Sequence, residues 1–259
     1  MTAGIFDAHT HLDMGRAQGD VDRAAATLLE EMRACGISQA ILLPLVELGY
    51  TNDDMVRVTA RCPELIGFAT VHPHDPRAED VLTHSIQSQR LRGLKLHPRL
   101  QRFALLDEGV ARLLVRAGEL QVPVVIDCFP DRDDIVNGNL PATYDRLARL
   151  APHTRIVMAH LGGHHVLDAM MVVKRNTNLF IDLSFSLLYY RGSSVVQDIG
   201  YAIRNLKGLK VLYGSDYPDR SMKETLEQSL ALLQQFSLSE QELDRVLRGN
   251  AEELLAYSR

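Results

Sequence analysis

The chain has 259 residues, of which 46% are hydrophobic, and carries a formal net charge of -5. This size allows one large core, and the mixed charges form no basic stripe of the kind that binds nucleic acid. No apolar run approaches the ~20 residues that cross a membrane, and the N-terminus lacks the features of a secretory signal. The three cysteines show no C-x-x-C spacing, which favours a reduced, cytoplasmic setting.

Short apolar strands alternate with helices along the whole chain. In the first half, a strand from Ile5 leads into His9 and His11, followed by a helix at 22–34, a strand at 39–44, a helix at 52–61, a strand at 65–71, a helix at 77–90, a strand at 91–97 and a helix at 106–120. In the second half, strands at 122–127, 155–160, 179–183 and 209–216 alternate with helices at 142–150, 166–174, 194–206 and 223–235. A capping box at Ser239-x-x-Glu242 opens a last helix through 247, and a final helical turn covers 251–257.

This alternation predicts a parallel sheet that is covered by helices on its outside. Eight strand–helix units in this length fit an α/β fold of the (β/α)₈ TIM-type barrel, whose usual size is about 250 residues. An open doubly wound sheet is the alternative, but no Gly-x-Gly-x-x-Gly follows the first strand. We therefore expect a single domain over 1–259, with a helical extension at its C-terminal end.

Ionisable side chains end six of the eight apolar strands. They are His9 and His11, Lys95 and His97, Asp127, His160, Asp182, and Asp216. Such groups cost desolvation energy at the end of a buried strand unless they are paired or coordinated. Because the active site of a TIM barrel lies at the carboxyl ends of its strands, we expect these side chains to form a functional site.

A divalent metal would explain part of this pattern. Residues i and i+2 of a strand share a face, so His9 and His11 present two imidazoles side by side. The first and last strands close the barrel, which brings Asp216 toward the same point. A metal held there would lower the pKa of a bound water, and His160 would act as acid or base.

Six segments carry a resemblance to the amidohydrolase superfamily: FDAHTHLD, GLKLHPRLQRF, PVVIDC, RIVMAHLGG, LYGSDYP and GNAEELLAYS. They look most like its branch of small metal-dependent hydrolases and decarboxylases, which includes aminocarboxymuconate semialdehyde decarboxylase, γ-resorcylate decarboxylase and pyrone dicarboxylate lactonase. The resemblance implies a distorted (β/α)₈ barrel and a homodimer. It also implies that His9 and His11 bind metal, that His160 is a ligand or the catalytic base, and that Asp216 binds the metal or its water.

Asp127 departs from this family, which usually has a histidine at the end of the fifth strand. Aspartate can still bind metal, so the expected ligands are His9, His11, Asp127 and Asp216. The expected ion is zinc, and this harder donor set would shift the preference toward manganese or iron(II). The alternative is a hydrogen-bonding or salt-bridge role for Asp127, with a metal that is weakly held or absent.

Four residues are candidates for binding the substrate. Lys95 and His97 share a strand face, and together with Arg99 they would hold an acidic group, while Tyr189 would form part of the pocket wall. Each also has an alternative role: Lys95 as an ion-pair partner of Asp127 or a carbamylated metal bridge, Arg99 as a surface residue, and Tyr189 in loop packing.

The leading functional hypothesis is a metal-dependent hydrolase. It would act on a small, acidic lactone, amide or ester through metal-activated water. The first alternative is a non-oxidative decarboxylase of the same superfamily. The second is a non-catalytic or metal-free binding barrel.

Overall fold

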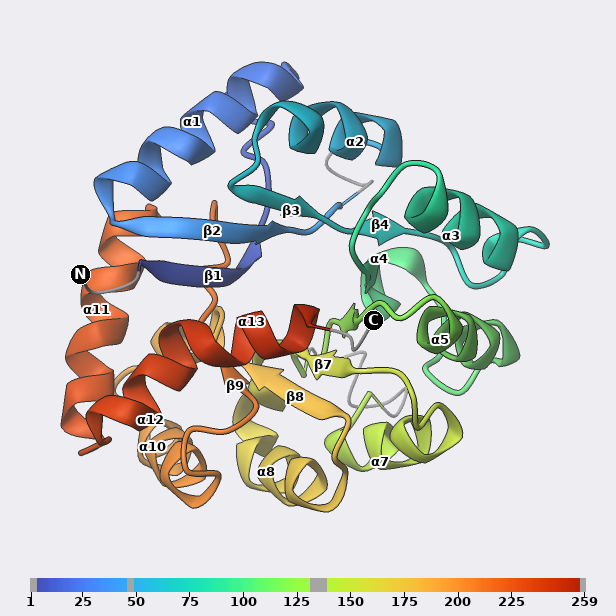
Figure 1. The fold of residues 1–259 in the computed structure, drawn as a ribbon. Helices are drawn as coiled ribbons and strands as arrows, with labels where there is room; N and C mark the ends of the chain where they lie inside the picture. The colour runs from blue at the N-terminus through green and yellow to red at the C-terminus, as the bar shows by residue number, and fades with distance from the viewer. Residues whose placement is uncertain (1–3, 46–48, 131–138, 257–259) are drawn as a thin grey trace.

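The computed structural model describes residues 4–45, 49–130 and 139–256, and parallel strands form its centre (Figure 1). The strands are β1 (Ile5–Thr10), β2 (Ile37–Leu42), β3 (Leu65–Gly67), β4 (Ala69–Thr70), β5 (Leu94–Leu96), β6 (Val124–Ile126), β7 (Ile156–Met158), β8 (Leu179–Asp182) and β9 (Val211–Leu212). They pair in chain order, β1 to β3 in one sheet and β4 to β9 in another.

Backbone hydrogen bonds join the two sheets at Phe68. The amide of Phe68 donates to the carbonyl of Leu42 at 3.1 Å, and the amide of Ala69 donates to Gly93 at 2.8 Å. The strand expected at 65–71 is therefore one barrel strand that changes partner at Phe68, and it appears as β3 and β4.

The other seam joins the first strand to the last. The amide of Ala8 donates to Tyr213 at 2.8 Å, and the amide of His11 donates to Tyr217 at 2.8 Å. Thr10 and Tyr217 also form a parallel bridge. These contacts close the barrel with eight strand units, so the expected single-domain (β/α)₈ barrel is confirmed.

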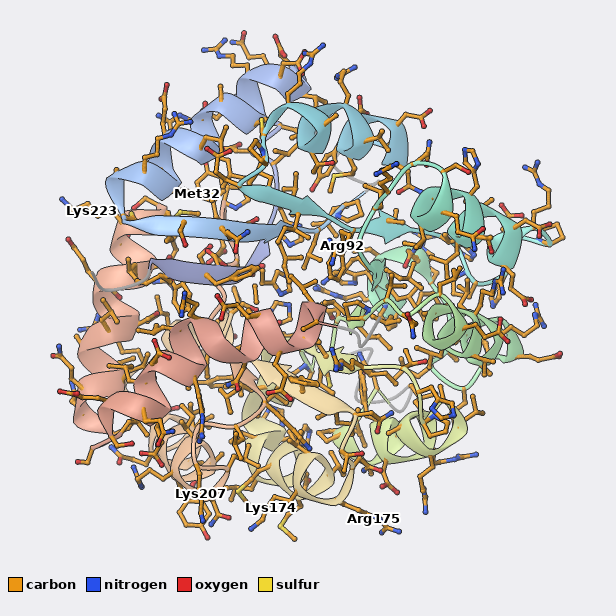
Figure 2. All side chains as sticks on the ribbon, in the orientation of Figure 1. Met32, Arg92, Lys174, Arg175, Lys207 and Lys223 are labelled. Carbon is orange, nitrogen blue, oxygen red and sulfur yellow. The ribbon has the colours of Figure 1, made fainter. Side chains whose placement is uncertain are left out.

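Helices surround the barrel, with their apolar faces inward. They are α1 (Val21–Ala34), α2 (Asn52–Arg61), α3 (Ala78–Gln87), α4 (Pro98–Gln101), α5 (Glu108–Glu119), α7 (Pro141–Leu150), α8 (Val166–Arg175), α9 (Ser186–Tyr189), α10 (Val195–Asn205) and α11 (Met222–Gln235). In Figure 2, Met32 lies between α1 and β2, while Lys174, Arg175 and Lys207 lie at the outer edge of the ring. Among the helices of the described residues, none combines the length and the apolar character needed to cross a membrane.

The last helical stretch covers the N-terminal opening of the barrel. It consists of α12 (Glu240–Asp244), the π-helical turn η3 (Arg245–Gly249) and α13 (Asn250–Leu255). Figure 1 shows α13 lying across the barrel opening. Its residues Ala251 and Leu254 pack against Phe6 and other side chains of the barrel interior. Nη1 of Arg155, which directly precedes β7, donates to the carbonyls of Glu253, Leu254 and Ala256 at 2.6 to 3.1 Å.

The capping box at Ser239 and Glu242 is confirmed. The break expected at Gly249 and Asn250 does not occur, because both have helical backbone angles. The side-chain amide of Asn250 donates to the carbonyls of Gly208 and Val211 at 2.6 and 2.7 Å. These bonds fix the helix to the segment that leads into β9.

Candidate active site

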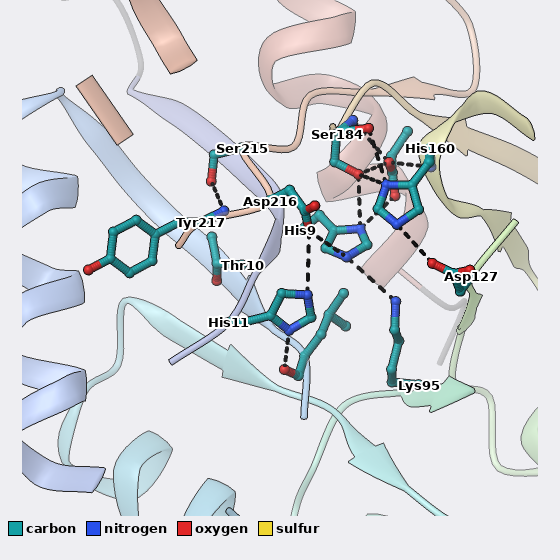
Figure 3. Close-up of polar contacts among 12 residues, drawn as sticks. His9, Thr10, His11, Lys95, Asp127, His160, Ser184, Ser215, Asp216 and Tyr217 are labelled. Carbon is teal, nitrogen blue, oxygen red and sulfur yellow. Dashed lines mark hydrogen bonds and ion pairs between the residues drawn. The ribbon is translucent and has the colours of Figure 1, made fainter. Parts of the chain in front are cut away.

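The ionisable strand ends meet at the opposite, carboxyl-terminal opening of the barrel (Figure 3). The group consists of His9, His11, Lys95, His97, Asp127, His160, Asp182 and Asp216. All are buried except Asp216, whose side chain is 17% exposed. The ionisable strand ends therefore lie together at one opening, and their contacts divide them into two groups.

The first group contains His9, His11 and Asp216. Oδ1 of Asp216 lies 3.5 Å from Nε2 of His9 and 3.5 Å from Nε2 of His11. Donor atoms that surround a zinc ion tetrahedrally at about 2.1 Å are themselves about 3.4 Å apart. The spacing of these three atoms thus suits a small divalent cation, and the three residues form a potential metal-binding cluster.

The protonation of the two histidines supports the same conclusion. Nδ1 of His9 lies 2.9 Å from Oδ2 of Asp182, and Nδ1 of His11 lies 2.8 Å from the carbonyl of Leu43. Both acceptors favour a proton on Nδ1, so Nε2 of either ring, when neutral, carries a free lone pair. Burial and the charge of Lys95 lower the pKa of His9 to about 4, which keeps that ring neutral.

Asp216 completes this arrangement as an anion. Burial opposes its ionisation, but the contact with His11 and the charge of His160 hold its pKa well below the usual range. With both rings neutral, two nitrogen lone pairs and a carboxylate oxygen face one another. This donor set fits a divalent metal.

The β1–β9 seam places these ligand atoms. Oδ1 of Asp7 accepts hydrogen bonds from the amides of His9 at 3.1 Å and Ser215 at 2.9 Å. Burial raises the pKa of Asp7 to about 7. At Gly214, a Cβ atom would lie 2.8 Å from Cβ of His9, so only glycine allows this close approach.

The second group contains Asp127, His160 and His97. Oδ2 of Asp127 lies 3.0 Å from Nε2 of His160 and 3.5 Å from Nε2 of His97. Nδ1 of His97 accepts from the amide of Leu100, which leaves the proton of a neutral ring on Nε2. Burial lowers the pKa of His97 to about 3, so His97 is a neutral donor to Asp127.

His160 is the cation of this group. Burial alone would lower its pKa, but the hydrogen bond with Asp127 and the charge of Asp216 outweigh burial and raise the pKa to about 9. The hydrogen-bond partners of His160 support its charged state, because Nε2 faces a carboxylate and Nδ1 faces the carbonyl of Ser184 at 3.2 Å. Burial opposes the ionisation of Asp127 too, yet His97 and His160 hold its pKa well below the usual range.

Asp182 and Ser184 connect the two groups. Oδ2 of Asp182 binds His9, while its Oδ1 accepts from the amide of His160 at 3.0 Å and from the hydroxyl of Ser184. Oγ of Ser184 also lies 2.9 Å from Nδ1 of His160. Sequence reasoning noted Asp182 as a strand end but gave it no role, and it missed Ser184. The available signal was their spacing, because residues 182 and 184 follow the same strand two positions apart.

The backbone between these residues adopts unusual conformations. His160 and Leu161 have φ of 62° and 58°, and Asp216 and Phe185 have φ of 56° and 55°. Side chains other than glycine rarely adopt such left-handed angles, and strained residues of this kind gather at functional sites. In this conformation, the amide of His160 donates to Oδ1 of Asp182 at 3.0 Å.

The expected substrate-binding residues differ in position. Lys95 is buried, and its Nζ lies 3.5 Å from Nε2 of His9. His97 is in contact with Asp127, as described above. Arg99 is exposed on α4, from where its charge acts on His97. Tyr189 is 55% exposed.

Tyr189 belongs to an aromatic wall beside His160, which also contains Phe129, Phe185 and Tyr190. Phe185 stacks on Tyr189 with ring centroids 5.0 Å apart and meets Phe129 edge to face at 4.9 Å. The centroids of Phe129 and Phe185 lie 6.2 and 6.1 Å from that of His160. One side of the site is thus lined by aromatic rings.

The fold is that of an α/β-barrel enzyme, and the strand ends hold a cluster of histidines and aspartates that resembles a metal site. The chain belongs to the amidohydrolase family, whose model matches residues 6–256. No functionally curated protein matches the chain.

Several solved structures share the fold over almost their whole length. An uncharacterised TIM-barrel protein from Bordetella bronchiseptica is 21% identical, with a TM-score of 0.81 and coverage of 97% of this chain and 98% of the other. A probable 2-pyrone-4,6-dicarboxylic acid hydrolase from Acinetobacter baumannii is 18% identical, with a TM-score of 0.71 and coverage of 98% and 100%. The 5-carboxyvanillate decarboxylase from Sphingomonas paucimobilis is 16% identical, with a TM-score of 0.71 and coverage of 98% and 99%.

Proposed function

We propose that this protein is a metal-dependent hydrolase for a small, acidic, carbonyl-containing substrate such as a lactone, amide or ester. The observation that carries the proposal is the convergence of Nε2 of His9, Nε2 of His11 and Oδ1 of Asp216, with acceptors facing Nδ1 of both rings. A divalent ion at this point, with zinc as the first choice and manganese or iron(II) as alternatives, would polarise the substrate carbonyl and lower the pKa of water.

The protein side chains would move the protons. The second carboxylate oxygen of Asp216 would accept the proton of the attacking water, since this carboxylate stays ionised. His160 would donate a proton to the leaving group, because its raised pKa keeps it protonated at neutral pH. Asp127 would position His160, and its negative charge would keep the ring protonated until the leaving group takes the proton. The contact at 3.0 Å supports the salt-bridge role of Asp127 rather than its role as a fourth metal ligand.

The substrate would lie between the charged residues and the aromatic wall. Lys95, His97 and Arg99 are the candidates for holding its acidic group. Tyr189 and Phe185 would pack against its planar part. A conjugated, anionic molecule suits both surfaces.

A decarboxylase is the second candidate, and the protonation of His160 favours it. After a carboxylate leaves as CO₂, the remaining carbanion needs a proton. His160, with both nitrogens acting as donors, would supply it. The solved structures with this fold include a hydrolase and a decarboxylase by name, so the two reactions need a direct test.

The test is a substrate panel in ¹⁸O-labelled water, with the protein loaded with zinc. Lactones, esters and amides of conjugated acids form one arm, and hydroxybenzoates form the other. The proposal predicts that ¹⁸O enters the product, that no CO₂ is released, and that a chelator stops turnover. Release of CO₂ without solvent oxygen in the product would show a decarboxylase. Elemental analysis that finds no stoichiometric metal, together with no turnover in either arm, would favour a binding barrel.

A further inference from the structure

Lys95 contacts Nε2 of His9, the atom that a metal ion would bind. Its Nζ lies 3.5 Å from Nε2 of His9, and its side chain is 1% exposed (Figure 3). Since Nδ1 of His9 already donates its proton to Asp182, the Lys95 ammonium meets the lone pair of Nε2. That lone pair is the one that would bind metal, so Lys95 and a metal ion depend on the same electron pair.

Three carboxylates around Lys95 favour its charged form. Burial lowers the pKa of Lys95, and the charges of Asp127, Asp182 and Asp216 oppose this effect. Among the charged groups described above, only Lys95 and His160 balance these three carboxylates. A divalent cation beside His9 would add charge of the same sign next to Lys95, and two cations at this spacing repel each other strongly in a low-dielectric site.

A second place for the ammonium lies nearby. Oδ1 of Asp127 is buried and has no hydrogen-bond partner among the residues described. A buried carboxylate oxygen without a donor is costly. The lysine side chain has four rotatable bonds and can therefore be directed from one neighbour to another.

We propose that Lys95 is an internal competitor of the metal ion. When metal is absent, Nζ of Lys95 donates to the lone pair on Nε2 of His9. When metal binds, Nζ moves to Oδ1 of Asp127. The inference rests on the metal site of the proposed function. Because Lys95 competes for His9, the site should bind metal less tightly than its donor atoms alone would allow. The fraction of protein that holds metal should then follow the metal concentration.

The first test compares the zinc affinity of the wild-type protein with that of Lys95→Met, Lys95→Gln and Lys95→Arg, measured against a chromophoric chelator at one pH. Removing the cation in Lys95→Met is expected to tighten zinc binding at least about tenfold. Lys95→Gln keeps a polar end without charge and should behave in the same way, which protects the test if the Met variant does not fold. Lys95→Arg keeps the charge and should stay within about threefold of wild type.

Each other outcome has a clear meaning. Zinc affinity that is unchanged in both neutral variants overturns the competitor role but leaves the metal site intact. Weaker zinc binding in both neutral variants, together with wild-type binding that bicarbonate strengthens, would show that a carbamylated Lys95 binds the metal. This result would also overturn the competitor role. Failure of the wild-type protein and all variants to bind any divalent metal would overturn the proposed metal site as well.

The second test uses the wild-type chain alone. Crystals grown with zinc should show Nζ of Lys95 within about 3.2 Å of Oδ1 of Asp127, at hydrogen-bonding distance. Nζ should then lie well beyond its present 3.5 Å from Nε2 of His9. A zinc-bound structure in which Nζ keeps its position beside His9 would contradict the inference.

Discussion

The two halves of the site treat protons in opposite ways. Around Asp216, the facing atoms of the neutral His9 and His11 rings are lone pairs, and this arrangement suits a cation. Around Asp127, the facing atoms of His160 and His97 are N–H groups, and both face Oδ2 of the carboxylate. The same residue types, histidine and aspartate, therefore form a potential metal site in one half and an acid–base pair in the other.

The difference comes from what each ring contacts on its far side. Asp182 and the carbonyl of Leu43 take the Nδ1 protons of His9 and His11, and this leaves Nε2 bare. His160 has an acceptor on each side, so it holds two protons. The residues behind the rings thus determine which histidines can bind metal. The following predictions test that division, from the largest expected effect to the smallest.

Replacing Asp216 with alanine should abolish metal binding. The variant loses one of three donors and the anion that balances the metal charge, so zinc affinity should fall at least about 1,000-fold. Competition with a chelator measures this effect. The matched control is Asp219→Ala, an exposed carboxylate on the same loop that pairs with Arg220. Equal loss in both variants would mean that the loop, and not the ligand, was damaged.

The stability of the metal-free protein should fall between pH 6.5 and 9 because of His160. A pKa raised to about 9 in the folded state, against 6.5 in the unfolded chain, stabilises the fold fully below pH 6.5. That contribution disappears as the pH rises through 9, and it amounts to about 3 kcal/mol. Urea unfolding of wild type and His160→Gln in chelator measures it. Parallel pH curves for the two proteins would refute the charged state of His160.

Asp182→Asn should weaken metal binding by about 10- to 100-fold without removing a ligand. An amide NH₂ in place of Oδ2 would donate to Nδ1 of His9, which would shift the ring proton to Nε2 and block the metal. Ser184→Ala is the matched control, because it removes a nearby hydrogen bond to Asp182 while the carboxylate stays. Wild-type affinity in Asp182→Asn would show that the far-side partner does not control His9.

Asp127→Asn should have the smallest effect on metal affinity, less than about fivefold. In the same variant, the loss of the carboxylate charge should lower the pKa of His160 from about 9 toward 6.5, as followed by NMR. If Asp127 binds the metal directly, zinc affinity would instead fall at least about 100-fold. This result would move Asp127 from the acid–base half to the metal half.

The position of the site followed from the sequence, because polar residues at the ends of apolar strands must gather at one opening of a parallel barrel. His9, His11 and Asp216 meet for this reason. The contacts of Asp127 did not follow. A strand-end carboxylate can face several neighbours, and its choice of His160 depends on how β7 ends in left-handed residues. Spacing in the sequence does not encode that turn.

The fold shows the same limit at two places. The apolar run at 65–71 predicted one strand, but its change of partner at Phe68 depends on hydrogen bonds to the carbonyls of Leu42 and Gly93, which are distant in the sequence. Gly249 and Asn250 suggested the end of a helix. In the structure, the side-chain amide of Asn250 donates to the carbonyls of Gly208 and Val211, and the helix continues through this residue. Local patterns fail where a distant backbone group supplies the partner.

The helix α13 has a consequence for the kinetics of the protein. Ala251 and Leu254 fill one opening of the barrel, and Arg155 binds three carbonyls at the end of that helix. In the proposed reaction, substrate and product would therefore share the opening at the carboxyl ends of the strands. A molecule that has reacted would leave by the route through which the next one arrives, and we expect the product to inhibit competitively.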